Sequence, residues 1–174
     1  MATTTTDRRS RMERRVWDAL AEVKDPEIPA VSVVELGIIR SVEAGAGRIR
    51  VEMLPTFVGC PALELIRASI AERLAGMAPE VQVEATFAEP WTSDRITPEG
   101  RRKLRESGFA PPAPRAAEPA DQPLFPTITT RPGVRCPFCG SRDTVLENPF
   151  GPTLCRAIHW CNQCRQPFEQ FKAV

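Results

Sequence analysis

Several features that mark common protein classes are missing from this sequence. Its formal net charge is only +1, so it has no broad charged field for binding nucleic acid or a membrane surface. No apolar run approaches the roughly 20 residues that a membrane-spanning helix needs. The N-terminus has no apolar stretch after its charged residues, unlike a secretory signal peptide. These absences favour a cytoplasmic protein with no nucleic-acid or membrane partner.

Catalytic side chains are also scarce. The chain has a single histidine, His159, and it has no Gly-rich phosphate loop and no Ser/His/Asp set. A nucleophilic side chain normally needs a neighbouring base, and no histidine lies in the N-terminal two thirds of the chain. The sequence therefore argues against a protease-like or acyl-transfer enzyme, and we predict that the protein is not itself an enzyme.

What the sequence does have is an uneven distribution of cysteine. Cys60 stands alone, whereas the other five cysteines fall between residues 136 and 174. Four of these form two Cys-x-x-Cys pairs: Cys136, Cys139, Cys161 and Cys164. Thiolates at this spacing suit a tetrahedral zinc site, and the same ligands also bind iron. An exported protein could pair them as disulfides, but without an export signal they indicate a metal site. We therefore predict a rubredoxin-like zinc ribbon over residues 134–174.

Cys155 and His159 lie between the two pairs. Either could replace one of the four ligands, and Cys155 is a possible extra ligand, but the paired spacing is complete without them. Four aromatic residues are expected to supply a small core around the metal: Phe150, Trp160, Phe168 and Phe171. A module with so few apolar residues usually needs its metal in order to fold.

The N-terminal part of the chain shows the patterns of an α+β domain. Residues 1–9 are expected to form a short disordered tail, followed by an amphipathic helix from Ser10 to Lys24. Periodic apolar residues then predict a hairpin over 38–53, a helix over 61–76, a strand over 81–87 and a helix over 97–107. The expected fold is a small sheet with packed helices over residues 10–109. A proline-rich linker, residues 110–133, joins it to the ribbon.

The stretch Thr56–Ala62 joins the hairpin to the next helix, and it contains Cys60. Pro61 suits the first helical position, which would make Cys60 the N-cap residue beside unpaired backbone N–H groups. That setting favours thiolate over thiol, and hence a nucleophile or a metal–sulfur ligand. The alternative is a small buried hydrophobe, the commoner role of a single cysteine. Local spacing leaves both interpretations open.

Two carboxylates stand close together upstream of the hairpin. Asp25 and Glu27 flank Pro26, and Pro29 follows, so the backbone here is restricted. They are either solvated acids of an ordinary turn or groups that a rigid loop presents to a ligand or partner. Spacing alone favours the turn.

Taken together, these motifs resemble a known family. The residues that carry the resemblance over roughly 10–110 are Asp25-Pro26-Glu27-Ile28-Pro29, Val34-Glu35-Leu36-Gly37, Pro55-Thr56 and Gly59-Cys60-Pro61-Ala62. They look like the metal–sulfur cluster biosynthesis domain of the SufT type. The four-cysteine ribbon, ending in Pro167-Phe168-Glu169-Gln170-Phe171-Lys172, extends the resemblance over nearly the whole chain to the D subunits of bacterial phenylacetyl-CoA epoxidases.

The resemblance implies an iron–sulfur cluster assembly fold, with Cys60 as ligand of a transient cluster or of the client. Asp25, Glu27 and Thr56 would shape its pocket. It also implies an accessory factor of phenylacetate catabolism, whose partners are the iron–sulfur reductase and the oxygenase of the epoxidase. Maturation of the reductase is the expected role, or else maturation of the oxygenase metal. The alternatives are a structural subunit of the oxygenase and a nucleic-acid-binding ribbon protein. A homodimer, offering two cysteines to one cluster, is a further expectation.

Overall fold

The computed structural model of the chain describes residues 3–57, 62–112 and 133–172. The chain divides into two compact units, Met1–Lys103 and Leu104–Val174. The first unit has an α+β fold, and the second is the four-cysteine ribbon. Across the described residues, no helix is long and apolar enough to cross a membrane.

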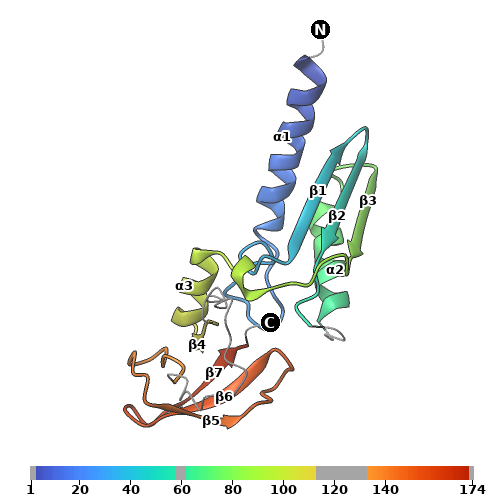
Figure 1. Cartoon of the computed structure of the whole chain (residues 1–174). Coiled ribbons are helices and arrows are strands. Elements are labelled where there is room, and N and C mark those ends of the chain that lie inside the picture. The colour runs from blue at the N-terminus through green and yellow to red at the C-terminus, as the bar shows by residue number, and fades with distance from the viewer. Residues whose placement is uncertain (1–2, 58–61, 113–132, 173–174) are drawn as a thin grey trace, which may run out of the picture. The chain divides into compact units, whose positions relative to one another are not determined.

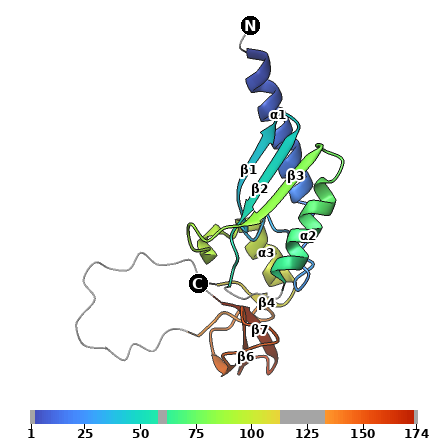
Figure 2. The same ribbon diagram turned by 90° about the vertical axis from the view of Figure 1, so that its right-hand side faces the viewer.

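The first unit is built on a three-stranded sheet with the order β1-β2-β3 (Figure 1). β1 (Ile39–Gly45) and β2 (Arg48–Met53) form an antiparallel hairpin, whereas β3 (Glu80–Ala85) runs parallel to β2. The helix α2 (Leu63–Leu74) connects β2 to β3, as a parallel pair requires. It packs with α1 (Thr3–Leu20) on one face of the sheet (Figures 1 and 2). This mixed sheet with packed helices is the predicted fold class.

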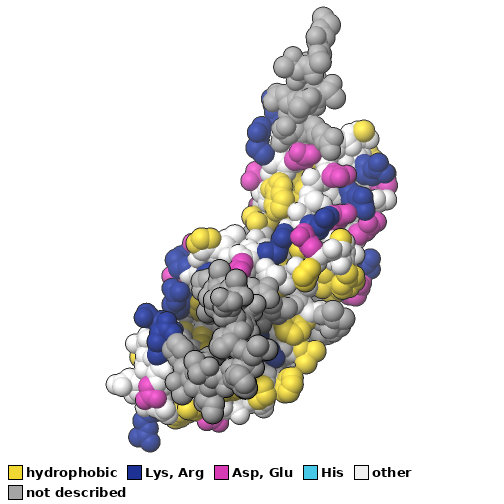
Figure 3. Space-filling view, viewed as in Figure 1, with side chains coloured by type: hydrophobic (Ala, Val, Ile, Leu, Met, Phe, Trp, Pro, Cys, Tyr) yellow, Lys and Arg dark blue, Asp and Glu magenta, His cyan; other side chains and the backbone are white. Residues whose placement is uncertain are grey.

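The two faces of the sheet account for the alternating sequence pattern. Three apolar side chains of β2 are fully buried: Ile49, Val51 and Met53. The opposite face carries charges of both signs (Figure 3), among them Arg50, which pairs with Glu84 at 3.0 Å. Because exposed ion pairs contribute little stability, the buried apolar side chains hold the sheet to its helices.

The hairpin turn contains a strained residue. Ala46 and Gly47 separate β1 from β2, and both have positive φ, at 51° and 81°. Two central residues with positive φ form a type I′ turn, whose twist matches that of the flanking strands. Gly47 adopts this conformation freely, whereas the Cβ of Ala46 makes the left-handed region unfavourable.

The prediction of a disordered N-terminal tail was wrong. α1 begins at Thr3, so Ser10 lies inside the helix instead of capping it. No proline or glycine occurs between residues 3 and 20, and a helix that has started extends more easily than a new one forms. The helix ends at Leu20, one turn before the predicted end at Lys24.

Glu35 links the loop before β1 to the segment after β3. One oxygen of its carboxylate accepts a hydrogen bond from the backbone N–H of Ser32 at 2.8 Å, and the other accepts from Nζ of Lys103 at 2.5 Å. The backbone carbonyl of Glu35 accepts a hydrogen bond from the N–H of Thr97 at 2.9 Å. Thr97 also caps α3 (Pro98–Glu106), because its Oγ1 accepts a hydrogen bond from the backbone N–H of Gly100.

Gly37 allows a close approach by the same segment. Its φ is +65°, and a Cβ at this position would lie 2.4 Å from the carbonyl oxygen of Arg95. Arg95, in the short 3-10 helix η1 (Ser93–Arg95), donates from Nε to the carbonyl of Gly37 at 3.0 Å. The buried indole of Trp91 donates to the carbonyl of Leu36 at 3.0 Å. The segment after β3 is therefore fixed by backbone groups of the loop before β1.

The second unit is a four-stranded sheet with the order β4-β7-β6-β5. β5 (Thr144–Asn148), β6 (Arg156–Cys161) and β7 (Pro167–Phe171) are antiparallel, and β4 (Phe109–Ala110) pairs parallel with β7. The sequence pattern placed the domain boundary at residue 109, but the compact units divide after Lys103, and β4 joins the ribbon sheet. A strand of two residues is too short to show any periodicity.

Candidate functional site

The four paired cysteines come together at one end of the ribbon. The Sγ atoms of Cys136, Cys139, Cys161 and Cys164 all lie within 4.8 Å of one another. Cys136 and Cys164 are 3.7 Å apart, and Cys139 and Cys161 are 3.5 Å apart. Four sulfurs bound to one zinc at about 2.3 Å in tetrahedral geometry must be separated by about 3.8 Å. The donor set therefore fits a tetrahedral thiolate site for zinc or iron.

The two Cys-x-x-Cys turns have the same backbone geometry. The N–H of Gly140 donates to the carbonyl of Cys136 at 3.0 Å, and the N–H of Arg165 donates to the carbonyl of Cys161 at 2.8 Å. Each residue follows the second cysteine of its pair with positive φ, 77° for Gly140 and 58° for Arg165. Glycine was expected at such a position, but nothing in the sequence indicates that Arg165 takes the same conformation.

The thiols of the second turn differ in acidity. The backbone N–H of Cys164 lowers the pKa of the Cys161 thiol to about 7, because it stabilises the thiolate. Burial raises the pKa of the Cys164 thiol to about 12. Metal binding requires all four thiols to lose their protons, so the affinity of the site for a metal ion should rise with pH.

The core of the ribbon is smaller and less aromatic than predicted. Its buried cluster contains Ala110, Cys136, Cys161 and Phe168. Phe171 is also buried, but Phe150 is 62% exposed. The ammonium group of Lys172 lies over the Phe150 ring, 5.0 Å from its centroid. Two of the cluster side chains are themselves paired cysteines, so metal binding and core packing involve the same residues.

Cys155 and His159 lie outside the group of four sulfurs. Cys155 is buried, with its Sγ 3.1 Å from Oγ1 of Thr153. His159 is buried on β6, where its Nε2 is 2.9 Å from Oε1 of Gln170 and its ring stacks on Phe168. Burial lowers the pKa of His159, although the hydrogen bond to Gln170 opposes this shift. Both side chains are thus engaged in ribbon packing.

The loop that contains Cys60 follows the carboxyl end of β2. Cys60 itself lies outside the described residues, and Thr56, which precedes it, is half-buried. α2 is described from Leu63, and Ala62 before it already has a helical backbone conformation (φ −75°, ψ −13°). The predicted N-cap position of Cys60 therefore lies outside the described residues and stays a prediction. Carboxyl ends of parallel strands are nevertheless a common place for ligand sites in sheets of this kind.

Asp25 and Glu27 form part of a tight turn. Oδ1 of Asp25 accepts hydrogen bonds from the backbone N–H groups of Glu27 at 2.9 Å and Ile28 at 2.8 Å. This arrangement is an Asx turn, in which a side chain replaces a backbone acceptor. The assignment of Asp25, Glu27 and Thr56 to a pocket around Cys60 stays a prediction.

Comparisons with known proteins agree with this two-part organisation. Residues 13–87 match the family described as iron–sulfur cluster assembly protein, and residues 120–172 match the PaaD zinc beta ribbon domain. The crystal structure of a Domain of Unknown Function DUF59 from Bacillus anthracis has a similar fold. It has a TM-score of 0.54 at 24% identity and matches 57% of this chain and 96% of that one.

A full-length relative joins the two halves. The chain is 39% identical over 162 residues to the D subunit of the Escherichia coli K12 "Putative 1,2-phenylacetyl-CoA epoxidase". The match covers 91% of this chain and 92% of the relative. With its cluster-assembly fold and its clustered ribbon cysteines, the chain therefore belongs to the family of phenylacetyl-CoA epoxidase D subunits.

Proposed function

We propose that this protein is an accessory factor of a phenylacetyl-CoA epoxidase that assembles or delivers the iron–sulfur cluster of the reductase component. The observation that carries the proposal is the match of residues 13–87 to a cluster-assembly family within a chain of the epoxidase D-subunit family. The protein would act in the cytoplasm, where thiols stay reduced. The cluster is the cargo of this protein and the cofactor of its client.

Cys60 is the residue that we propose handles the cargo. It is the only cysteine in the first unit's sequence, and thiolates are preferred ligands of iron–sulfur clusters. The loop that contains it begins where β2 ends and leads into α2. One thiolate from one chain would hold a cluster loosely, which suits transfer to a client. Two chains could offer two such ligands, so a homodimer is part of the proposal.

The ribbon would have a structural role in this scheme. Cys136, Cys139, Cys161 and Cys164 would hold zinc permanently, because four thiolates satisfy a tetrahedral ion and leave no open position for chemistry. In the first unit, the Asx turn of Asp25 fixes the backbone around Glu27. We propose that this turn and Thr56 shape the surroundings of Cys60.

A deletion strain tests the proposal. Without this chain, the reductase and the oxygenase should be made, but the isolated reductase should be poor in iron and sulfide. The Cys60→Ser chain should fail to restore the iron content, while the Cys155→Ser chain should restore it. Cys155 is a matched control because it is the other cysteine outside the group of four.

Reconstitution separates the proposal from its main alternative. If the chain is needed only for assembly, chemical loading of the reductase should restore epoxidation with the chain still absent. If loaded reductase and oxygenase stay inactive until the chain is added, the protein is instead a structural subunit. Full iron content in the reductase of the deletion strain would also contradict the proposal.

A further inference from the structure

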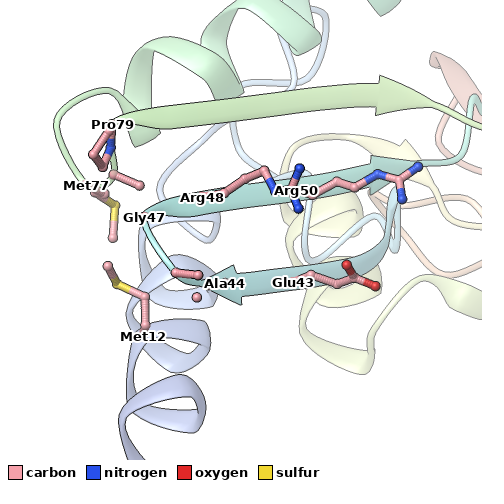
Figure 4. A pocket seen from close by; sticks show the side chains of 11 residues that line it. Met12, Glu43, Ala44, Gly47, Arg48, Arg50, Met77 and Pro79 are labelled. Atoms are coloured by element: carbon pink, nitrogen blue, oxygen red, sulfur yellow. The ribbon is translucent and has the colours of Figure 1, made fainter. Parts of the chain in front are cut away.

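A groove of about 720 Å³ lies at the hairpin end of the first unit's sheet. Met12 of α1 and Met77 of the loop between α2 and β3 point toward one another across it, and Ala44 and Pro79 add apolar surface (Figure 4). Its volume is in the range of ligand-binding pockets. The proposed function assigns no role to this groove.

The groove is apolar on one side and positively charged on the other. Met12 and Met77 are half-buried, and unbranched thioether side chains adapt to apolar partners of different shapes. Arg48 and Arg50 extend along β2 beside them (Figure 4). Arg50 pairs with Glu84 and Glu52 on the sheet. Arg48 is exposed, and its guanidinium group makes no ion pair or hydrogen bond with any residue in the described parts of the chain.

The helix beside the groove has the same sign of charge. Residues 8–15 contain five arginines and one glutamate, although the net charge of the whole chain is only +1. Of these, Arg15 is exposed and follows Met12 by three positions, which places it on the same side of the helix. Glu43 is the one acid that lines the groove among the described residues. A positively charged rim around an apolar floor favours a ligand that combines carboxylates with a large apolar side chain.

We propose that the groove between Met12 and Met77 binds an acidic peptide segment of a partner protein, anchored by a leucine-like side chain. The anchor contacts the two thioethers, and carboxylates on either side of it pair with Arg48 and with α1. The groove lies at the start of β2, whereas the Cys60 loop follows the end of β2. A partner bound here therefore leaves the proposed cargo site accessible, and the inference does not depend on the function of Cys60.

The four methionines of the chain give a site-specific test. Met12 and Met77 line the groove, whereas Met53 is fully buried in the sheet and serves as an internal control. The probe is a synthetic peptide of about 14 residues, roughly four helical turns, made of Asp and Glu with two Leu four positions apart. Titrating it into the full-length zinc-loaded chain with ¹³C-methyl methionine should shift the Met12 and Met77 signals and leave Met53 in place.

Control peptides and variants decide the outcome. A peptide with Ser in place of Leu, and one with Lys in place of the acids, should each bind at least about tenfold more weakly. Arg48→Glu should weaken binding of the acidic peptide by a similar factor, and Arg48→Ala repeats the test if the reversal disturbs the fold. Arg142→Glu, an exposed arginine of the ribbon, should have no effect. Equal binding of all three peptides, no shift at Met12 and Met77, or unchanged binding by both Arg48 variants would overturn the proposal.

Discussion

Replacing Glu35 with glutamine tests whether this residue fastens the segment after β3 to the rest of the first unit. The carboxylate accepts hydrogen bonds from the N–H of Ser32 at 2.8 Å and from Nζ of Lys103 at 2.5 Å. A glutamine side chain has the same shape but only one acceptor oxygen. In Glu35→Gln, one of the two donors must therefore face an NH₂ group.

The size of the effect follows from these two contacts. A hydrogen bond to a charged group contributes about 1.5–3 kcal/mol to stability. The Glu35 side chain is 17% exposed and that of Lys103 is 28% exposed. Water can therefore replace part of the hydrogen bonding that the variant loses. We expect Glu35→Gln to lower the free energy of unfolding of the first unit by about 2 kcal/mol at neutral pH. Glu99→Gln, which removes an exposed pair with Arg102, should change it by much less.

Urea unfolding followed by the fluorescence of Trp91 measures this loss. Trp91 is buried and bonded to the Glu35–Gly37 loop, so it reports on the contact once Trp17 and Trp160 are replaced by phenylalanine in both proteins. Burial alone would raise the pKa of Glu35, but Lys103 and the N–H of Ser32 outweigh it and hold the pKa below its ordinary value of 4.5. A lowered pKa stabilises the fold above pH 4.5, and that stabilisation is lost as the pH falls through the folded-state pKa.

The difference between wild type and Glu35→Gln should therefore be full at neutral pH, shrink as the pH falls below 4.5, and vanish only below the lowered pKa of Glu35 in the folded state. A loss no larger than that of Glu99→Gln would show that the carboxylate is not what holds the two segments together. A difference that persisted unchanged in acid would show that charge has no part in it. Either result would refute the reasoning from hydrogen bonds to stability.

Three further predictions concern the turns and the metal. Arg165→Gly should raise the affinity of the ribbon for zinc, measured by competition with a chelator. The left-handed conformation of Arg165 costs about 1–2 kcal/mol, which exceeds the entropy that a glycine loses on folding, about 0.5–1 kcal/mol. Unchanged affinity would contradict this prediction. Cys139→Ser should release the metal and make residues 134–172 protease-sensitive while the first unit stays intact, since such zinc sites supply about 10–16 kcal/mol. A variant that keeps one tightly bound zinc would show that the ligand assignment is wrong. Ala46→Asn should raise the free energy of unfolding of the first unit by about 0.5–1 kcal/mol, because Asn suits a type I′ turn. The gain should appear as a higher midpoint of thermal unfolding. A lower midpoint would mean that Ala46 is not strained.

The sequence predicted those elements whose signals are local. The hairpin follows from alternating apolar residues on either side of Gly45–Gly47, and α3 follows from the Thr97 cap and Pro98. The four sulfurs come together because each pair is held by its own turn, and the pairing of β5 with β6 brings the first pair toward the second. A close sequence spacing and a short-range hydrogen bond are enough to fix such features.

Features that depend on distant partners were missed. β4 is visible only through its pairing with β7, which lies far along the chain. Phe150 was expected in the core because it is aromatic, yet it lies in the connection between β5 and β6 and stays exposed. Hydrophobicity without periodicity does not say which face a side chain takes.

The motif residues of the first unit divide into two groups when their contacts are considered. Glu35 and Gly37 hold the segment after β3, and Asp25 closes a turn with its own side chain. These residues are needed for the fold whether or not they touch a ligand, so their presence in a motif does not by itself assign them a chemical role. Cys60 differs, because it is the single thiol in the sequence of the first unit, and thiolates are the ligands that iron–sulfur clusters prefer. This is why the proposal rests on Cys60 and not on the carboxylates.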